Sequence, residues 1–267
     1  RRVGAVGLGL TVLLGWAAEK QGVFRQTEKA FYADERTINF VRPGLVVKVV
    51  GAAIAADGTI TADVQVTDPR GLPLDRLGIT TPGPVSLSLV AAVLPSDSER
   101  YTSYTTRVRT AAGTGKQAIQ AAADTGGTFT EAGPGLYRYT FRTKAPSGID
   151  RSATHSIGVY SNRNLSEFDL GTNYASHVYN FVPAGGAVTK THDIIRTESC
   201  NGCHQDLNFH GGSRRGVEMC VLCHTPQTTD PVTGNTLDMA VMTHKIHTGA
   251  DLPSVQAGGK YQLNGFG

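Results

Sequence analysis

The chain has 267 residues, of which 40% are hydrophobic and 18% are charged, and its formal net charge is +3. This length suits one large domain or two smaller ones, and the composition favours a packed core over a disordered chain. The net charge is too small to indicate a nucleic-acid partner or a polybasic membrane-binding surface, so we expect no nucleic acid among the partners.

The first residues resemble an export signal. Arg1 and Arg2 precede a run without charges from residue 3 to residue 18. That order is typical of a signal peptide or a short membrane anchor, because sixteen helical residues extend about 24 Å against a hydrocarbon core of ~30 Å. We expect an exported protein, on the periplasmic side of a membrane or at the cell surface, with residues 3–18 as its anchor where they are retained. Residues 19–40 are expected to be a linker.

Residues 41–185 have the pattern of a β-domain. Strands are predicted where apolar residues are continuous or alternate with polar ones, at residues 46–54, 60–66, 85–89, 137–142 and 157–159. Turn residues between them favour a β-sandwich or barrel. Residues 112–127 are rich in alanine and glycine and predict a surface loop with room for one short helix. His155 and His177 stand alone and are expected on the surface or on an edge strand.

All four cysteines lie in two copies of one motif. The copies are Cys200-Asn201-Gly202-Cys203-His204 and Cys220-Val221-Leu222-Cys223-His224. Cys-x-x-Cys-His is the attachment signature of c-type haem, in which the sulfurs form thioethers with the vinyl groups and the histidine binds the iron. Residues 186–267 are therefore expected to form a small, largely irregular and helical domain with two covalently attached haem c groups.

Two other interpretations of the cysteines remain open. Sixteen residues separate Cys203 from Cys220, a spacing that also suits a four-cysteine zinc site. An exported protein could instead form two disulfides. The histidine after each cysteine pair favours haem, because zinc ribbons do not require it and the chain has only eight histidines.

Further histidines are available as second iron ligands. His204 and His224 are the proximal candidates, and His210, His244 and His247 are the distal candidates, with His192 as a weaker fourth. Residues 236–248 predict a helix capped by Asn235 or Thr236 and ended by Gly249, which places His244 and His247 on one side. Two haems need two distal ligands, so one histidine is either a bystander or the ligand of a haem attached beyond Gly267.

Two arginines lie between the motifs. Arg214 and Arg215 are candidates for binding the haem propionates, because guanidinium groups suit carboxylates. The alternative is a solvated loop.

The same residues resemble a known family. The two haem motifs, the stretches His210-Gly211-Gly212 and His244-Lys245-Ile246-His247, and the ending Leu252-Pro253-Ser254-Val255 are similar to the OmcA/MtrC family of decahaem c-type cytochromes. Upstream, the resemblance extends to Arg42-Pro43-Gly44-Leu45, Asp57-Gly58, Asp68-Pro69 and Thr81-Pro82-Gly83. It implies a β-domain before a multihaem domain, proximal ligands at His204 and His224, and distal ligands at His210, His244 and His247.

The functional hypotheses follow from this assignment. The resemblance implies electron transfer through bis-histidine haems towards a partner redox protein, a haem-bearing subunit of a membrane complex, or an extracellular metal acceptor. We expect no enzymatic activity, since an iron with two histidines has no open coordination position. The rival hypotheses are a haem reductase with one open iron and a zinc-stabilised binding protein.

Overall fold

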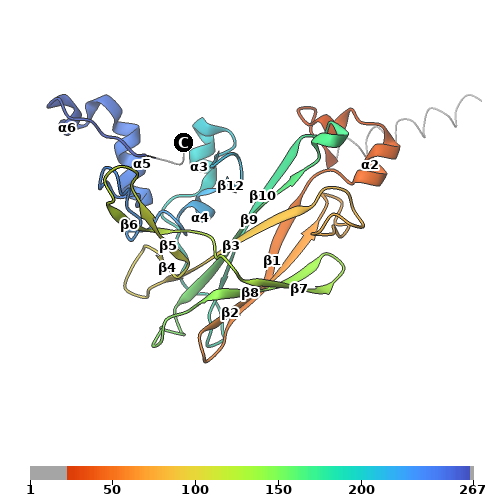
Figure 1. Ribbon diagram of the computed structural model, residues 1–267, viewed down its shortest axis with the longest axis horizontal. Helices are drawn as coiled ribbons and strands as arrows, with labels where there is room; N and C mark the ends of the chain where they lie inside the picture. Colours follow the sequence, from red (N-terminus) through yellow and green to blue (C-terminus); the bar gives the residue numbers. More distant parts are fainter. Residues whose placement is uncertain (1–22, 265–267) are drawn as a thin grey trace, which may run out of the picture.

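The computed structural model describes residues 23–264 and consists mainly of two four-stranded antiparallel sheets (Figure 1). One sheet has the strand order β1-β2-β8-β7 and the other β10-β9-β3-β4. Their strands are β1 (Val46–Ile54), β2 (Thr59–Thr67), β3 (Val85–Leu94), β4 (Thr102–Ser103), β7 (Thr128–Gly133), β8 (Leu136–Lys144), β9 (Thr154–Asn164) and β10 (Thr172–Phe181). The predicted mainly β fold is confirmed.

The other elements are short. Two small hairpins pair β5 (Thr106–Thr110) with β6 (Gln117–Ala121) and β11 (Asn208–Phe209) with β12 (Arg214–Arg215). The helices are η1 (Lys29–Phe31), α2 (Glu35–Val41), η2 (Ser166–Phe168), α3 (Thr197–His204), α4 (Val217–Cys220), α5 (Met239–Thr248), η3 (Gly249–Asp251) and α6 (Pro253–Gln256). Within residues 23–264, none of them combines the length and the apolar character needed to cross a membrane. The predicted signal peptide or anchor lies outside the described residues.

The sheet that contains β3 is buried on both faces. Successive strand residues point to opposite faces. Leu89 and Ala91 belong to the core between the two sheets, whereas Val90 and Ala92 belong to a second core on the outer face. This explains why residues 89–94 of β3 form a continuous apolar run, whereas apolar residues and serine alternate at residues 85–88. The second core also contains residues that carry the haem motifs, so the outer face of this sheet supports the candidate site.

Two sequence predictions about this region were wrong. Residues 112–127 contain strand β6 and no helix, and β6 pairs with β5 so that Val108 faces Ile119. His155 is not a surface or edge residue, because it lies on the inner strand β9 with 1% of its surface exposed. Its ring nitrogens reach Tyr104 Oη at 3.2 Å and the Asp150 carbonyl at 3.0 Å. His177 does lie on an edge strand, β10, where its Nδ1 accepts from the Val49 N–H at 3.2 Å.

The segment predicted as a linker contains η1 and α2. Arg163 of the sandwich forms hydrogen bonds with the C-terminal end of α2. Asp34 caps α2 by accepting from the Thr37 N–H at 3.0 Å. At the other end of the helix, the fully buried Arg163 guanidinium donates to carbonyls of Val41 and Arg42, both at 2.6 Å. It also donates to the carbonyls of Gly44 and Pro82. Burial lowers the pKa of Arg163 to about 10, so the group is still charged at neutral pH.

Removing this guanidinium is expected to destabilise the protein strongly. In Arg163→Met, several buried carbonyls lose their donor at once, and each unsatisfied polar group costs about 1–3 kcal/mol. We expect the free energy of unfolding, measured by denaturant titration, to fall by about 3 kcal/mol or more. Arg138→Met is the control, because its ion pair with Asp63 is largely exposed and exposed pairs contribute about 1 kcal/mol at most. Equal losses in the two variants would contradict this role of Arg163.

Candidate haem-binding site

The first motif lies on an exposed helix. Helix α3 places Cys200 and Cys203 three residues apart and ends with His204. None of its residues is buried, Cys203 and His204 are exposed, and Cys200 is half-buried. The cysteine sulfurs and the histidine therefore lie at the surface of the described structure, where a haem can cover them.

The second motif is more buried than the first, with Cys220 buried and Cys223 and His224 half-buried. Cys220 ends α4 with 9% of its surface exposed, and the N–H groups of Cys223 and His224 both donate to its carbonyl, at 3.1 and 2.9 Å. Burial is the largest cause that raises the pKa of the Cys220 thiol to about 12 and that of the Cys223 thiol to about 11. Both thiols are protonated at neutral pH, unlike the low-pKa thiolate of a nucleophilic cysteine.

A glycine in the β-sheet makes room for this second motif. Gly158 lies in the middle of β9, and a Cβ atom there would lie 2.6 Å from Leu222 Cδ1 and 3.0 Å from Met219 Cε. These two residues belong to the outer-face core together with Val90. The segment that holds Cys220 and Cys223 thus packs directly on the backbone of the sheet, which fixes its position.

Each proximal histidine faces a distal candidate. The ring centroids of His204 and His247 are 6.2 Å apart with an interplanar angle of 82°, and those of His210 and His224 are 6.1 Å apart at 27°. A bond from an imidazole nitrogen to a metal ion is about 2 Å long, so two imidazoles on opposite sides of one ion have centroids about 6 Å apart. Both separations match that arrangement.

Backbone carbonyls bind one ring nitrogen of three histidines at the candidate site, His224, His247 and His244. Nδ1 lies 2.9 Å from the Leu237 carbonyl in His224, 2.8 Å from the Thr243 carbonyl in His247, and 2.7 Å from the Ala240 carbonyl in His244. A carbonyl only accepts, so each Nδ1 carries the proton and Nε2 keeps its lone pair. This is the usual support of a histidine ligand, whose other nitrogen is fixed by an acceptor.

His210 stands at the tip of the β11–β12 hairpin. It has a positive φ of 53°, followed by Gly211 and Gly212 with φ of 73° and 90°. A Cβ at Gly212 would lie 3.2 Å from the Tyr174 ring, so the tight turn needs glycine there both for its φ and for its space. The His210-Gly211-Gly212 stretch thereby aims the imidazole towards His224.

The remaining histidines lie apart from these two pairs. His244 precedes His247 by one turn of α5, and it is exposed. The helix begins at Met239 with Asp238 as its cap, so the predicted start at Thr236 was wrong, whereas the predicted end at Gly249 is confirmed. His192 stacks on Tyr101 with ring centroids 6.0 Å apart. Its buried Nδ1 has no hydrogen-bond partner among the described residues.

The two neighbouring arginines differ in what they contact. The Arg215 guanidinium donates to Asp206 at 2.6 Å, while the Arg214 guanidinium lies 3.9 Å above the Tyr160 ring and donates to Ser213 Oγ. Within residues 23–264, no carboxylate lies at ion-pair distance from Arg214. Of the two predicted propionate partners, Arg214 is therefore the one whose charge is not already neutralised by a carboxylate.

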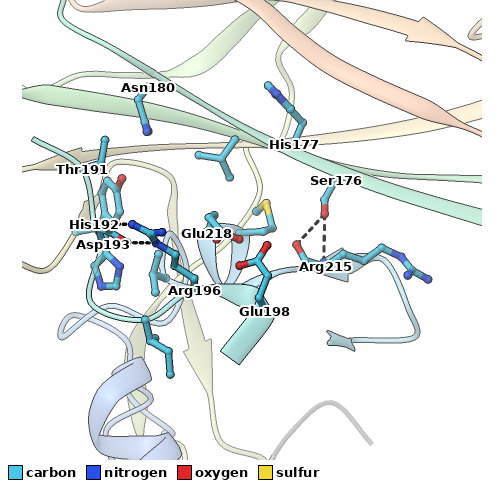
Figure 2. Close-up of a pocket in the computed structure, with 15 residues that line it drawn as sticks. Ser176, His177, Asn180, Thr191, His192, Asp193, Arg196, Glu198, Arg215 and Glu218 are labelled. Carbon is cyan, nitrogen blue, oxygen red and sulfur yellow. Dashed lines mark hydrogen bonds and ion pairs between the residues drawn. The ribbon is translucent and has the colours of Figure 1, made fainter. Parts of the chain in front are cut away.

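A cavity of about 590 Å³ lies beside the first motif, between β10 and the chain that leads into α3 (Figure 2). Glu198 and Glu218 line it, as do His177 and His192. Ser176 on β10 binds the Arg215 backbone there, with its Oγ donating to the carbonyl at 2.9 Å and accepting from the N–H at 3.2 Å. These bonds tie the β11–β12 hairpin, and hence His210, to the sheet.

The rival cysteine interpretations find no matching geometry in the described chain. All four cysteines are free thiols. A zinc site needs about four ligands around one ion, and nowhere in residues 23–264 do three or more histidine, cysteine or acidic side chains converge in that way. Four of the described histidines are instead arranged in two facing pairs.

Sequence reasoning did not find several residues that shape the site. The Leu237 carbonyl is the hydrogen-bond acceptor for His224, and the Tyr160 ring packs against the Arg214 guanidinium. Gly158 leaves the space in which the second motif packs on the sheet. The β5–β6 hairpin also contacts the segment after the second motif, with the Thr229 N–H donating to the Ile119 carbonyl at 3.3 Å. Only Gly158 carried a sequence signal, as a glycine inside a predicted strand.

The chain is similar to known multihaem cytochromes. Residues 192–264 match the family model described as outer membrane cytochrome MtrC/MtrF-like, domains II/IV. The chain is 30% identical over 150 residues to the multiheme cytochrome MtrC of Shewanella baltica (strain OS185), a match that includes 54% of this chain. It spans only 22% of the length of that relative.

Two solved structures have a similar fold. The outer membrane decaheme cytochrome OmcA superposes with a TM-score of 0.59 at 21% identity, covering 78% of this chain and 33% of OmcA. MtrC from Shewanella baltica OS185 superposes with a TM-score of 0.56 at 24% identity, covering 80% of this chain and 34% of MtrC. Both superpositions cover more of the chain than residues 192–264 and so include β-strands.

Proposed function

We propose that the chain is a member of the OmcA/MtrC family of multihaem c-type cytochromes and transfers electrons through covalently attached haem c groups. The observation that carries the proposal is the pairing of each motif histidine with a second histidine at a centroid distance of about 6 Å. The residues thus fit two haems, each attached through one motif and bound by two histidines.

The proposed ligand sets follow from the pairing. Cys200 and Cys203 attach the first haem, and His204 and His247 bind its iron. Cys220 and Cys223 attach the second haem, and His224 and His210 bind its iron. A bound haem supplies an iron that changes its oxidation state by one electron.

The protein residues have two roles in this arrangement. Two histidines on each bound iron would leave no coordination position for a substrate, so a bound haem would exchange electrons without forming a bond to the acceptor. The carbonyls of Leu237 and Thr243 keep His224 and His247 in place as ligands. The packing of α4 on the sheet fixes the second attachment site relative to the β-domain.

His244 is proposed as a ligand for a haem attached to another segment. It has the same Nδ1 support as His247 and lies one turn away on the same helix. The proposal also includes the domain division made from the sequence: a membrane segment, a linker, a β-domain at residues 41–185 and a haem domain at residues 186–267. It further includes export of the protein to the outer membrane or cell surface, where it would pass electrons to other redox proteins or to an extracellular metal acceptor.

Counting haems is the direct test. We expect a denaturing gel of the purified protein to stain for covalent haem, and the intact mass to show two haems on this chain. A colourless protein that holds zinc would refute the proposal. Carbon monoxide distinguishes the proposed electron-transfer protein from a haem reductase. A ferrous iron with a free coordination position binds carbon monoxide and its absorption spectrum changes, whereas an iron bound by two histidines does not bind it.

A further inference from the structure

The two haem motifs lie in environments of different polarity. In the second motif Cys220 is buried, and Val221 and Leu222 belong to the outer-face core. Cys223 packs against this core, as does Cys200 of the first motif. Helix α3, which carries Cys200 and Cys203, has no buried residue. The ferric form of a haem carries one more positive charge than the ferrous form, and burial in an apolar environment disfavours charge. Burial therefore favours the ferrous form more at the second motif than at the first.

The arginines near the two motifs add to this difference. The Arg214 charge lies beside the second site, because β12 pairs Arg214 with Phe209, the residue before His210. The Arg214 guanidinium donates to Ser213 Oγ at 2.9 Å, and that hydroxyl donates to the His210 carbonyl at 3.2 Å. At the first motif, Arg215 is neutralised by Asp206 at 2.6 Å and Arg196 by Asp193 at 2.7 Å. A nearby positive charge disfavours the ferric form.

Two acidic groups near the second motif, Asp238 and Glu218, already have hydrogen-bond or ion-pair partners in the protein. Asp238 is 3% exposed, pairs with Arg100 at 3.4 Å and caps α5 through the Val241 N–H. Glu218 accepts from Thr197 Oγ1 at 2.7 Å and is exposed to solvent, which screens its charge. Pairing with Arg100 weakens the effect of the Asp238 charge and solvent weakens that of Glu218, so the two carboxylates offset only part of the effect of Arg214.

We propose that the haem on Cys220 and Cys223 has a higher midpoint potential than the haem on Cys200 and Cys203, with Arg214 as the residue that sets part of the difference. This inference rests on the proposed function. One electron then passes from the first iron, which is oxidised from ferrous to ferric, to the second iron, which is reduced from ferric to ferrous. No bond forms or breaks and no proton moves.

The imidazole planes give each haem a recognisable signal. The planes are nearly perpendicular for His204 and His247 and closer to parallel for His210 and His224, at 82° and 27°. Perpendicular axial imidazoles give a ferric low-spin haem a strongly anisotropic electron paramagnetic resonance (EPR) signal, whereas nearly parallel ones give a rhombic signal. Substituting His247 or His210 confirms which signal belongs to which haem.

The test is a redox titration of the full chain with both haems attached, followed by EPR. As the potential is lowered, we expect the signal that the His210→Ala substitution abolishes to disappear first in the unsubstituted protein. Loss of the His247-dependent signal first, or of both signals together, would overturn the inference and leave the proposed function intact. Absence of low-spin haem signals would instead refute the proposed function.

Arg214 variants test the role of its charge. We expect Arg214→Gln to shift the midpoint of the second haem to lower potential and Arg214→Lys to retain most of the original value. Arg215→Gln is the matched control, an adjacent arginine paired with Asp206, and it should leave the second midpoint unchanged. An unchanged midpoint in a folded Arg214→Gln protein, or the same shift in Arg215→Gln, contradicts the assignment to Arg214.

Discussion

Replacing Gly158 by valine is expected to displace the second haem motif from the sheet. Even the first added carbon would lie within 3.0 Å of Leu222, Val90 and Met219, and valine adds two further methyl groups. Overpacking of this kind costs about 1–3 kcal/mol. Because Leu222 and Met219 flank the attachment cysteines, relief of the clash moves His224 relative to His210. We expect a lower free energy of unfolding together with partial carbon monoxide binding at the reduced second haem.

Gly133→Val is the matched control for this substitution. Gly133 also lies in a strand, β7, but a Cβ there meets no atom within 4 Å, and its φ is not in the left-handed region. We expect the free energy of unfolding of Gly133→Val to change little and neither reduced haem in it to bind carbon monoxide. If Gly158→Val left the haems unchanged while reducing stability, the sheet would support the fold but not the geometry of the second site.

The candidate site could be located from the sequence because its two cysteine motifs are defined by local spacing. Cys-x-x-Cys-His is contiguous, so both attachment motifs are visible without a fold. The helix with His244 and His247 was also found, although Asp238 caps it rather than Asn235 or Thr236. Capping by Asp, Asn, Ser or Thr is similar in strength, so several neighbouring candidates could not be separated from sequence alone.

Long-range contacts explain what the sequence did not reveal. Pairing His204 with His247 joins residues separated by more than forty positions, and no periodicity encodes that contact. His155 was misplaced because strand β9 is buried on both faces, so its polar residues do not mark a solvent-exposed side. Strand β6 was missed because alanine-rich and glycine-rich segments have low strand propensity, and tertiary pairing with β5 overrides it.

The position of the second core suggests a reason for joining a β-sandwich to the haem region. The haem-bearing segment contributes Val217, Met219 and Leu222 to a core whose other side is the sheet. A short chain with few regular elements cannot bury much apolar surface alone. The sandwich supplies that surface, and it also supplies Tyr160 beneath Arg214. In the arrangement that we propose, the β-domain would determine the electrostatic environment of a bound haem as well as its position.

Removing the His247 imidazole is expected to leave the iron of the first haem with a free coordination position. Removing the His244 imidazole is expected to leave the coordination of both irons unchanged. The two histidines are matched controls for each other, since both are exposed on α5 and both bind a carbonyl four residues earlier through Nδ1. Only His247 faces a motif histidine, at 6.2 Å from His204.

In His247→Ala, the reduced protein should bind carbon monoxide at one haem, because a five-coordinate iron accepts a sixth ligand. The oxidised protein should at the same time lose the anisotropic EPR signal. In His244→Ala, both haems should keep their low-spin spectra on this chain. Carbon monoxide binding in His244→Ala but not in His247→Ala would reverse the assignment, and binding in both would mean that either histidine can serve the first iron.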